Sequence, residues 1–244
     1  GANKLYLNKG DFKFEDISVQ SGIQGKKAWS TGVVMVDINA DGFLDIYVLD
    51  AGSNIDAIRK SQLYINNKNN TFTEKAAEYN LADTGITTHA AFFDYDKDGD
   101  LDCYILNNSF ITVSSLNYSY KRELRDKDWK VADILKGGGD KLLRNDNGKF
   151  VDVSEASGIF GSLIGFGLGV TVGDVNGDLY PDIYVSNDFY ERDYLYINNK
   201  NGTFSEQIQT WATHISQASM GADLADINND GKADIFTTDM LPEG

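Results

Sequence analysis

The residues best suited to chemistry are carboxylates that recur at alternate positions of one nine-residue segment. In Asp94-Tyr-Asp-Lys-Asp-Gly-Asp-Leu-Asp102, aspartate stands at the first, third, fifth and ninth positions, and Gly99 stands at the sixth. Alternate side chains of this kind supply oxygens to a hard cation, the glycine permits a sharp turn, and the seventh residue offers its backbone carbonyl. The segment therefore predicts a calcium-binding loop.

The same pattern occurs four times, and each copy is followed by an apolar run. The other copies span 37–45, 174–182 and 226–234. Oxygen donors without His or Cys favour Ca²⁺ over zinc or copper, and a flexible cage disfavours Mg²⁺. We expect up to four Ca²⁺ ions. The predicted side-chain ligands are Asp37, Asn39, Asp41, Asp45, Asp94, Asp96, Asp98, Asp102, Asp174, Asn176, Asp178, Asp182, Asp226, Asn228, Asp230 and Asp234, and the predicted backbone-carbonyl ligands are Phe43, Asp100, Tyr180 and Lys232.

The loops differ from an EF-hand at the twelfth position. An EF-hand places a bidentate Glu there, whereas these copies carry Val48, Ile105, Val185 and Thr237. The flanking residues are β-branched and aromatic, so we expect each loop to join two strands, with the ninth aspartate closing the site. The third copy has Leu179 at the sixth position, where a positive φ would be strained. We therefore expect site three to bind more weakly or to have a rearranged turn.

Composition favours an all-β chain and disfavours anionic partners. The 244 residues carry a formal net charge of −15, which argues against binding to nucleic acid or to an anionic membrane surface. The chain has 24 Gly, 21 Asn and only two Pro, as expected of many tight turns. Cys103 is the only cysteine, so an intrachain disulfide is excluded, and we interpret this residue as a small buried hydrophobe. No apolar segment is long enough to span a membrane directly.

Two further elements recur around the loops. A strand, an Asn/Gly turn and a second strand are indicated at 5–14, 63–72, 142–150 and 195–204. Apolar segments rich in small residues precede the loops at 31–36, 90–93, 167–172 and 220–225, and they are typical of buried strands. One repeat unit is therefore four strands with a calcium loop between strands one and two. Such a unit cannot bury both of its faces alone, and radial stacking of units gives a β-propeller.

The repeats divide the chain into one partial β-propeller over residues 1–244. Residues 1–27 are expected to end a preceding blade, 28–87, 88–164 and 165–217 to form three blades, and 218–244 to begin another. The second blade contains an insertion at 108–139, within which 121–135 is a candidate short helix. The two half-blades could join and close a four-bladed ring, but we expect the chain to be a fragment of a longer protein.

Because strands alternate in direction, the connections fall on two faces. The calcium loops share one face, and the connections 51–62, 108–139 and 186–194 lie on the other. We expect this insertion face to contact another protein or a surface glycan. Trp29 and Trp211 are candidates for stacking on a sugar.

The chain resembles the FG-GAP/VCBS repeat family, whose calcium-loop blades also occur in the integrin alpha propeller. The fourfold loop followed by an apolar strand carries this resemblance across nearly the whole chain, and Gly22-Ile23 and Gly158-Ile159 are similar to the cartilage-acidic-protein branch found in bacteria. The resemblance implies an exported, larger propeller, often a lipoprotein on the bacterial outer-membrane surface or elsewhere outside the cell, without known catalytic residues.

We do not expect an enzyme. The aspartates are accounted for by cations, and His89 and His214 have no recurring Ser or Cys partner. The predicted function is a calcium-binding extracellular module for protein interaction, assembly or adhesion. The alternative is a carbohydrate-binding or carbohydrate-active propeller, a lyase or hydrolase, for which His89 and Glu191 are the few polar candidates near a central axis.

Overall fold

The computed structural model describes residues 1–25, 29–52, 59–109, 125, 128, 138–161, 163–189 and 191–240. Antiparallel strands form nearly all of its regular structure, as the alternation of apolar runs with Asn/Gly turns predicts. The strands are β1 Tyr6–Asn8, β2 Phe14–Asp16, β3 Ser30–Val36, β4 Asp45–Asp50, β5 Gln62–Asn66, β6 Phe72–Glu74, β7 Ile86–Phe93, β8 Asp102–Asn108, β9 Lys141–Asn145, β10 Phe150–Asp152, β11 Gly167–Gly173, β12 Asp182–Asn187, β13 Tyr194–Asn198, β14 Phe204–Glu206, β15 Ser219–Ala225 and β16 Asp234–Asp239.

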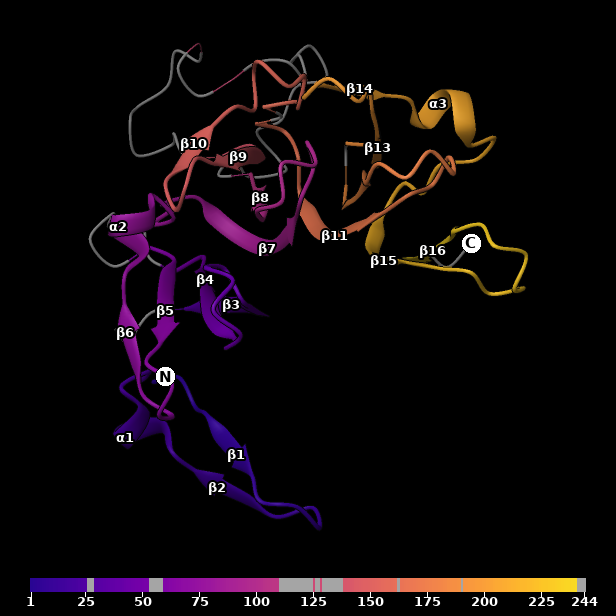
Figure 1. Cartoon of the computed structure of the whole chain (residues 1–244). Coiled ribbons are helices and arrows are strands. Elements are labelled where there is room, and N and C mark those ends of the chain that lie inside the picture. The colour runs from indigo at the N-terminus through magenta and orange to yellow at the C-terminus, as the bar shows by residue number, and fades with distance from the viewer. Residues whose placement is uncertain are drawn as a thin grey trace.

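The strands form three four-stranded sheets, each a meander in chain order. The first sheet is β3-β4-β5-β6, the second β7-β8-β9-β10 and the third β11-β12-β13-β14, while β1-β2 and β15-β16 are two-stranded. Figure 1 shows these sheets side by side along an open arc, with β3, β7, β11 and β15 toward its inner side. The expected all-β class and four-stranded units are confirmed. Within the described residues β1-β2 and β15-β16 remain separate sheets, so the two half-units do not join into a closed four-bladed ring.

The first strand of each unit is bent by a bulge at the same place. The register shifts between Ser30 and Gly32, between Thr87 and His89, between Gly167 and Gly169, and between Ser219 and Gly221. Next to the bulge, a threonine hydroxyl reaches the neighbouring sheet. Thr31 Oγ1 donates to the Thr87 carbonyl at 2.5 Å, and Thr88 Oγ1 donates to the Gly167 carbonyl at 2.7 Å. These bonds tie the inner strands of adjacent sheets together.

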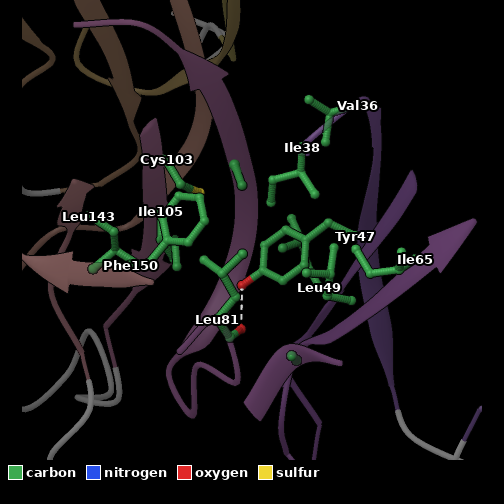
Figure 2. Close-up of a cluster of buried hydrophobic side chains, with 13 residues drawn as sticks. Val36, Ile38, Tyr47, Leu49, Ile65, Leu81, Cys103, Ile105, Leu143 and Phe150 are labelled. Carbon is green, nitrogen blue, oxygen red and sulfur yellow. Dashed lines mark hydrogen bonds between the residues drawn. The ribbon is translucent and has the colours of Figure 1, made fainter. Parts of the chain in front are cut away.

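Apolar cores lie between neighbouring sheets, as stacking of half-buried units requires. Between the first and second sheets, Tyr47, Leu49 and Ile105 are fully buried, and the Tyr47 hydroxyl donates to the Leu81 carbonyl at 2.8 Å (Figure 2). Cys103 is buried in this core, as predicted. Burial of each large aliphatic side chain contributes about 1.5–3 kcal/mol. The second core lies between the second and third sheets and contains Phe93, Tyr95, Tyr104, Leu106, Leu142, Ile159, Val170, Ile183, Val185, Tyr194, Tyr196 and Phe204.

Short helices follow the fourth strand of several units, and the sequence reasoning missed them. They are α1 Ser18–Ser21, α2 Ala76–Tyr79 and α3 Ile208–Trp211. An acidic residue two positions before the start of each helix accepts the backbone N–H of the first helical residue. Asp16 accepts from Ser18, Glu74 from Ala76 and Glu206 from Ile208, at 2.8–3.0 Å. The signal was present as an Asp or Glu two residues after the strand phenylalanine.

Two expectations concern segments that the structure describes only in part. The candidate helix at 121–135 lies outside the described residues apart from Arg125 and Asp128, as does most of the insertion 108–139.

Within the described part of the chain, every helix is too short to cross a lipid bilayer.

His89 couples the second and third sheets in a pH-sensitive way. The Val170 backbone N–H donates to His89 Nδ1 at 3.2 Å, so the ring must be neutral at that nitrogen. Burial lowers the pKa of His89 from its ordinary value of 6.5. The unfolded chain therefore binds a proton more readily, and the free energy of unfolding contributed by this group decreases as pH falls below about 6.5.

We expect His89→Gln, which keeps an acceptor, to reduce the loss of stability between pH 7.5 and pH 5 as measured by urea unfolding. The matched control is His214→Gln, at an exposed histidine. An identical pH dependence for the parent and His89→Gln would contradict this role.

Candidate metal centres

Each predicted calcium loop connects the first two strands of a unit and has the same internal hydrogen bonds. The ninth aspartate accepts the N–H of the second residue, and the first aspartate accepts the N–H of the sixth. The first kind of bond joins Ile38 to Asp45, Tyr95 to Asp102, Val175 to Asp182 and Ile227 to Asp234, at 2.9–3.2 Å. The second kind joins Gly42 to Asp37, Gly99 to Asp94, Leu179 to Asp174 and Gly231 to Asp226, at 2.8–3.1 Å.

The ninth aspartate of loops one to three is also held by the third strand of its sheet. The backbone N–H of Asn66 donates to Asp45 at 2.7 Å, and those of Asn145 and Asn198 donate to Asp102 and Asp182 at 2.8 Å. The side-chain amide of each asparagine donates to the carbonyl of the eighth loop residue, at Leu44, Leu101 and Pro181. Sequence reasoning missed this role, although the asparagine that ends each of these third strands was visible.

Loop two brings the most negative charge together. One carboxylate oxygen from each of Asp94, Asp96 and Asp102 lies within 4.8 Å of the others. Oδ1 of Asp94, of Asp96 and of Asp100 is buried and has no hydrogen-bond partner. A buried carboxylate oxygen without a donor costs free energy unless a cation or water satisfies it. The chemistry of these residues therefore fits a hard cation. The Asp100 side chain is an additional candidate ligand, since the sequence predicted only the backbone carbonyl of this residue.

Burial raises the pKa of the aspartates that close loops one to three. It raises the pKa of Asp102 to about 7, and it raises the pKa of Asp45 and Asp182 above the ordinary value, against the backbone donors named above. Burial and the neighbouring charge of Asp98 raise the pKa of Asp96 as well. A divalent cation would favour the ionised form of all these groups. The protein atoms of the loop therefore supply too little positive charge to offset the charge of these carboxylates.

Loops one, three and four hold fewer acids, because asparagine takes the third position and a residue other than aspartate takes the seventh. In loop one, Lys68 Nζ lies 3.4 Å from Asp41 Oδ2, and in loop three Lys200 Nζ lies 3.2 Å from Asp178 Oδ2. A bound cation would compete with these ammonium groups for the fifth aspartate. In loop four, Asp226, Asn228 and Asp230 are exposed, and their oxygens accept backbone N–H groups of the loop.

The seventh residues, whose carbonyls we predicted as ligands, lie at the same point of every loop. The backbone N–H of each donates to Oδ1 of the fifth aspartate at 2.9–3.1 Å. The donors are Phe43, Asp100, Tyr180 and Lys232, and the acceptors are Asp41, Asp98, Asp178 and Asp230. The described geometry thus keeps the fifth and seventh positions adjacent, as one coordination loop requires.

Loop three keeps the standard turn, so the expected rearrangement is wrong. Leu179 takes a φ of +70°, close to the +86° of Gly42, and its N–H still donates to Asp174 at 2.8 Å. The fourth position of every loop is also left-handed, and loop three has Gly177 there, at a φ of +77°. The hydrogen bonds of the loop therefore override the preference of leucine, at a cost of about 1–2 kcal/mol.

A second recurring carboxylate lies where the third strand begins, at the opposite end of the sheet from the carboxylate loops. The Tyr104 hydroxyl donates to Asp140 at 2.8 Å and the Asn107 N–H donates to its other oxygen, while Tyr184 makes the equivalent bond to Asp193 at 2.6 Å. Burial raises the pKa of Asp140 to about 7. These pairs connect strands two and three, and their partners assign them a structural role.

The other predicted residues lie on different elements of the chain. Trp29 precedes β3 and is 75% exposed, and Trp211 ends α3 and is 48% exposed. His89 lies on β7, where it accepts the Val170 N–H, and Glu191 is buried in the connection between β12 and β13.

Repeated four-stranded antiparallel units with a carboxylate loop between strands one and two define a repeat protein with candidate cation sites. A family model described as the FG-GAP-like repeat matches residues 1–48, 52–105 and 174–237, about two thirds of the chain. The chain belongs to the FG-GAP-like repeat family, as the sequence resemblance indicated.

Two other comparisons add little to the family assignment. No curated protein shows significant similarity to the chain. Among solved structures, it is similar to a lectin of Agrocybe aegerita whose structure is described as the basis of specific recognition of non-reducing terminal N-acetylglucosamine. The identity is 16%, the TM-score is 0.47, and the match covers 95% of this chain and 54% of the lectin chain. The chain thus spans about half the length of that lectin.

The sixth loop position yields a reciprocal test. Leu179 is 76% exposed, so Leu179→Gly removes backbone strain with little loss of burial, and we expect it to leave stability unchanged or raise it by about 1 kcal/mol. Gly42→Leu should lower the free energy of unfolding by about 1–2 kcal/mol, because it introduces the same strain. Chemical denaturation measures both. Destabilisation by Leu179→Gly as large as that by Gly42→Leu would show that the leucine side chain itself holds loop three.

Proposed function

We propose that the chain is a calcium-stabilised β-propeller module that acts outside the cell as a protein-interaction or adhesion surface and performs no catalysis. The observation that carries the calcium assignment is the set of buried, unpartnered carboxylate oxygens of Asp94, Asp96 and Asp100 in loop two. Cation loops that recur once per unit support a structural role, since each lies between the same two strands.

The residues of loop two would hold the ion with oxygens alone. Asp94, Asp96, Asp98 and Asp102 would supply carboxylates, and Asp100 would supply its backbone carbonyl or its side chain. The bound ion would supply positive charge that neutralises these groups. The first and ninth aspartates already position the backbone of the loop through Gly99 and Tyr95, so the chain holds the donors together while the ion offsets their repulsion.

The type of site supports the proposed extracellular location. Calcium sites with dissociation constants of about 10⁻⁴–10⁻³ M are typical of extracellular modules, where calcium is abundant. Exposed loops with a few carboxylates, such as loop four, suit that range better than the tight sites of intracellular buffers. The family resemblance, which implies export and often a lipoprotein anchor at a bacterial surface, supports the same location.

The interaction surface would be the rim opposite the calcium loops. The connection 186–194 presents Phe189, which is 47% exposed and lies against Phe166 with ring centroids 5.3 Å apart. Such an aromatic contact point suits a protein partner, because aromatic side chains are enriched at the cores of interfaces. Specific binding of a defined glycan by the chain would instead favour the carbohydrate-binding alternative.

The calcium sites are tested by counting bound ions. We expect calorimetric titration of the metal-free chain to show up to four Ca²⁺, and Asp94→Ala to bind one fewer. Asp96→Asn is the matched control. It converts loop two to the pattern of the other loops, so the ion count should stay the same while the affinity falls.

No calcium binding by the folded parent at millimolar Ca²⁺, or an unchanged count in Asp94→Ala, would contradict the assignment. Circular dichroism of each metal-free variant establishes that it is folded.

A further inference from the structure

The segment that follows strand four differs between the two junctions of complete sheets. The first junction lies between the first and second sheets, and the second junction lies between the second and third sheets. At the first junction the Tyr79 N–H donates to the Lys75 carbonyl at 3.2 Å. At the second junction the Ser157 N–H donates to the Val153 carbonyl at 2.8 Å. Ser157 therefore holds the position at the second junction that Tyr79 holds at the first.

A tyrosine ring occupies the space between the two sheets at the first junction. Tyr79 packs against the core between these sheets, and its Cε1 lies 3.8 Å from the place of a Cβ on Gly148, in the turn of the second sheet. Burial and the charge of Asp45, which closes loop one, raise the pKa of Tyr79. The phenol therefore lies within electrostatic range of a loop carboxylate. Beside the ring, Lys75 Nζ lies 3.1 Å from Glu78 Oε2.

Small side chains leave a groove in the same place at the second junction. Ser157 takes the position of the tyrosine, and Val153 and Ala156 take the positions of the ion pair. The groove has a volume of about 490 Å³ and is lined by these three residues, by loop two and by the turn 200–203 of the third sheet. Both of its walls belong to complete four-stranded sheets. The second junction therefore lacks an aromatic ring that the first junction contains.

The walls of this groove suit a phenol ring. Val153 and Ala156 supply an apolar side. Arg144, which pairs with Asp146 at 2.7 Å, lies at the groove with a guanidinium that can contact an aromatic face. Asp98 of loop two is exposed and lines the groove, so its carboxylate can accept a hydrogen bond from a hydroxyl group. A ring with a hydroxyl would thus meet an apolar surface and a loop carboxylate, as the phenol does at the first junction.

We propose that the groove at the second junction binds a tyrosine side chain of a partner protein, which takes the place that Tyr79 takes at the first junction. Tyrosine is enriched among the residues that contribute most of the binding energy of protein interfaces, where it enters well-packed pockets. The contact lies on the rim of the carboxylate loops, so it is additional to the surface around Phe189. It rests on the proposed role in protein interaction and not on the calcium assignment.

The experiment measures binding of a capped tripeptide, acetyl-Gly-Tyr-Gly amide, to the isotope-labelled folded chain at millimolar Ca²⁺. Heteronuclear NMR should show saturable shifts of the backbone amide signals of Ser157 and Gly202, which lie on opposite walls of the groove. The matching peptide with phenylalanine lacks the hydroxyl group. It should bind about threefold to tenfold more weakly, because one hydrogen bond is lost.

Reciprocal variants close one groove and open the other. Ser157→Tyr places a ring in the groove from within the chain and should lower the peptide affinity at least about tenfold. Tyr79→Ser opens the first junction, so a second set of saturable shifts should appear at Gly148. Ala156→Glu narrows the groove at an exposed position and should also weaken binding, which keeps the result decisive if Ser157→Tyr does not fold. Thr210→Glu, at the equivalent exposed position after the third sheet, is the matched control and should bind like the parent.

The proposal is overturned if the parent shows no saturable shifts at the groove up to about 10 mM peptide, or if folded Ser157→Tyr and Ala156→Glu both bind like the parent. A methyl glycoside that binds the same groove more tightly than the peptide would replace the tyrosine with a sugar ring, and would also overturn the proposed role in protein interaction. Calorimetric titration of Ca²⁺ on the same samples tests the calcium assignment separately. An intact ion count without peptide binding therefore refutes the groove contact alone.

Discussion

The buried aspartate that closes each of loops one to three is the constraint on which the unit depends. In loops one to three its side chain is completely inaccessible and accepts one backbone N–H from its own loop and one from the third strand. One carboxylate thus joins three consecutive parts of a sheet. An ionised group in that position is costly unless donors and opposite charge surround it. The backbone donors are present in the chain, and the opposite charge is what a cation would add.

This arrangement explains why the rest of each unit is built as it is. The loop joins strands one and two, so those strands must be antiparallel neighbours, and the asparagine must end strand three at the same level. The bulge lies near the other end of strand one, beside Thr31 and Thr88, whose hydroxyls contact the neighbouring sheet. Apolar residues of strands one to three then fill the space between sheets. Each sheet therefore depends on the hydrogen-bonded carboxylate loop at one end, and on its neighbouring sheets to bury its apolar side chains.

Local patterns were predictable, because the chemistry that they encode is local. The alternating carboxylates identified the loops, and the Asn/Gly turns identified strands three and four. Features that arise from contacts between distant residues were not predictable in the same way. The role of Asn145 as a donor to Asp102 connects residues far apart in the sequence. The left-handed φ of Leu179 is a local feature, but the preference of leucine argued against it, and the hydrogen bond from its N–H to Asp174 favours it. The short helices after strand four were missed although their signal is local, since Asp16, Glu74 and Glu206 each stand two residues before the first helical residue whose N–H they accept.

The most direct test of this account is the thermal unfolding midpoint with millimolar Ca²⁺ and with excess chelator. Ligand that binds only the native state must stabilise it, by about 2.7 kcal/mol per site at one hundred times the dissociation constant and less at lower saturation. We predict a large drop in the midpoint under chelator that Ca²⁺ reverses and Mg²⁺ reverses poorly. An unchanged midpoint would contradict the account, because it would mean that the carboxylate loops hold their strands together without a cation.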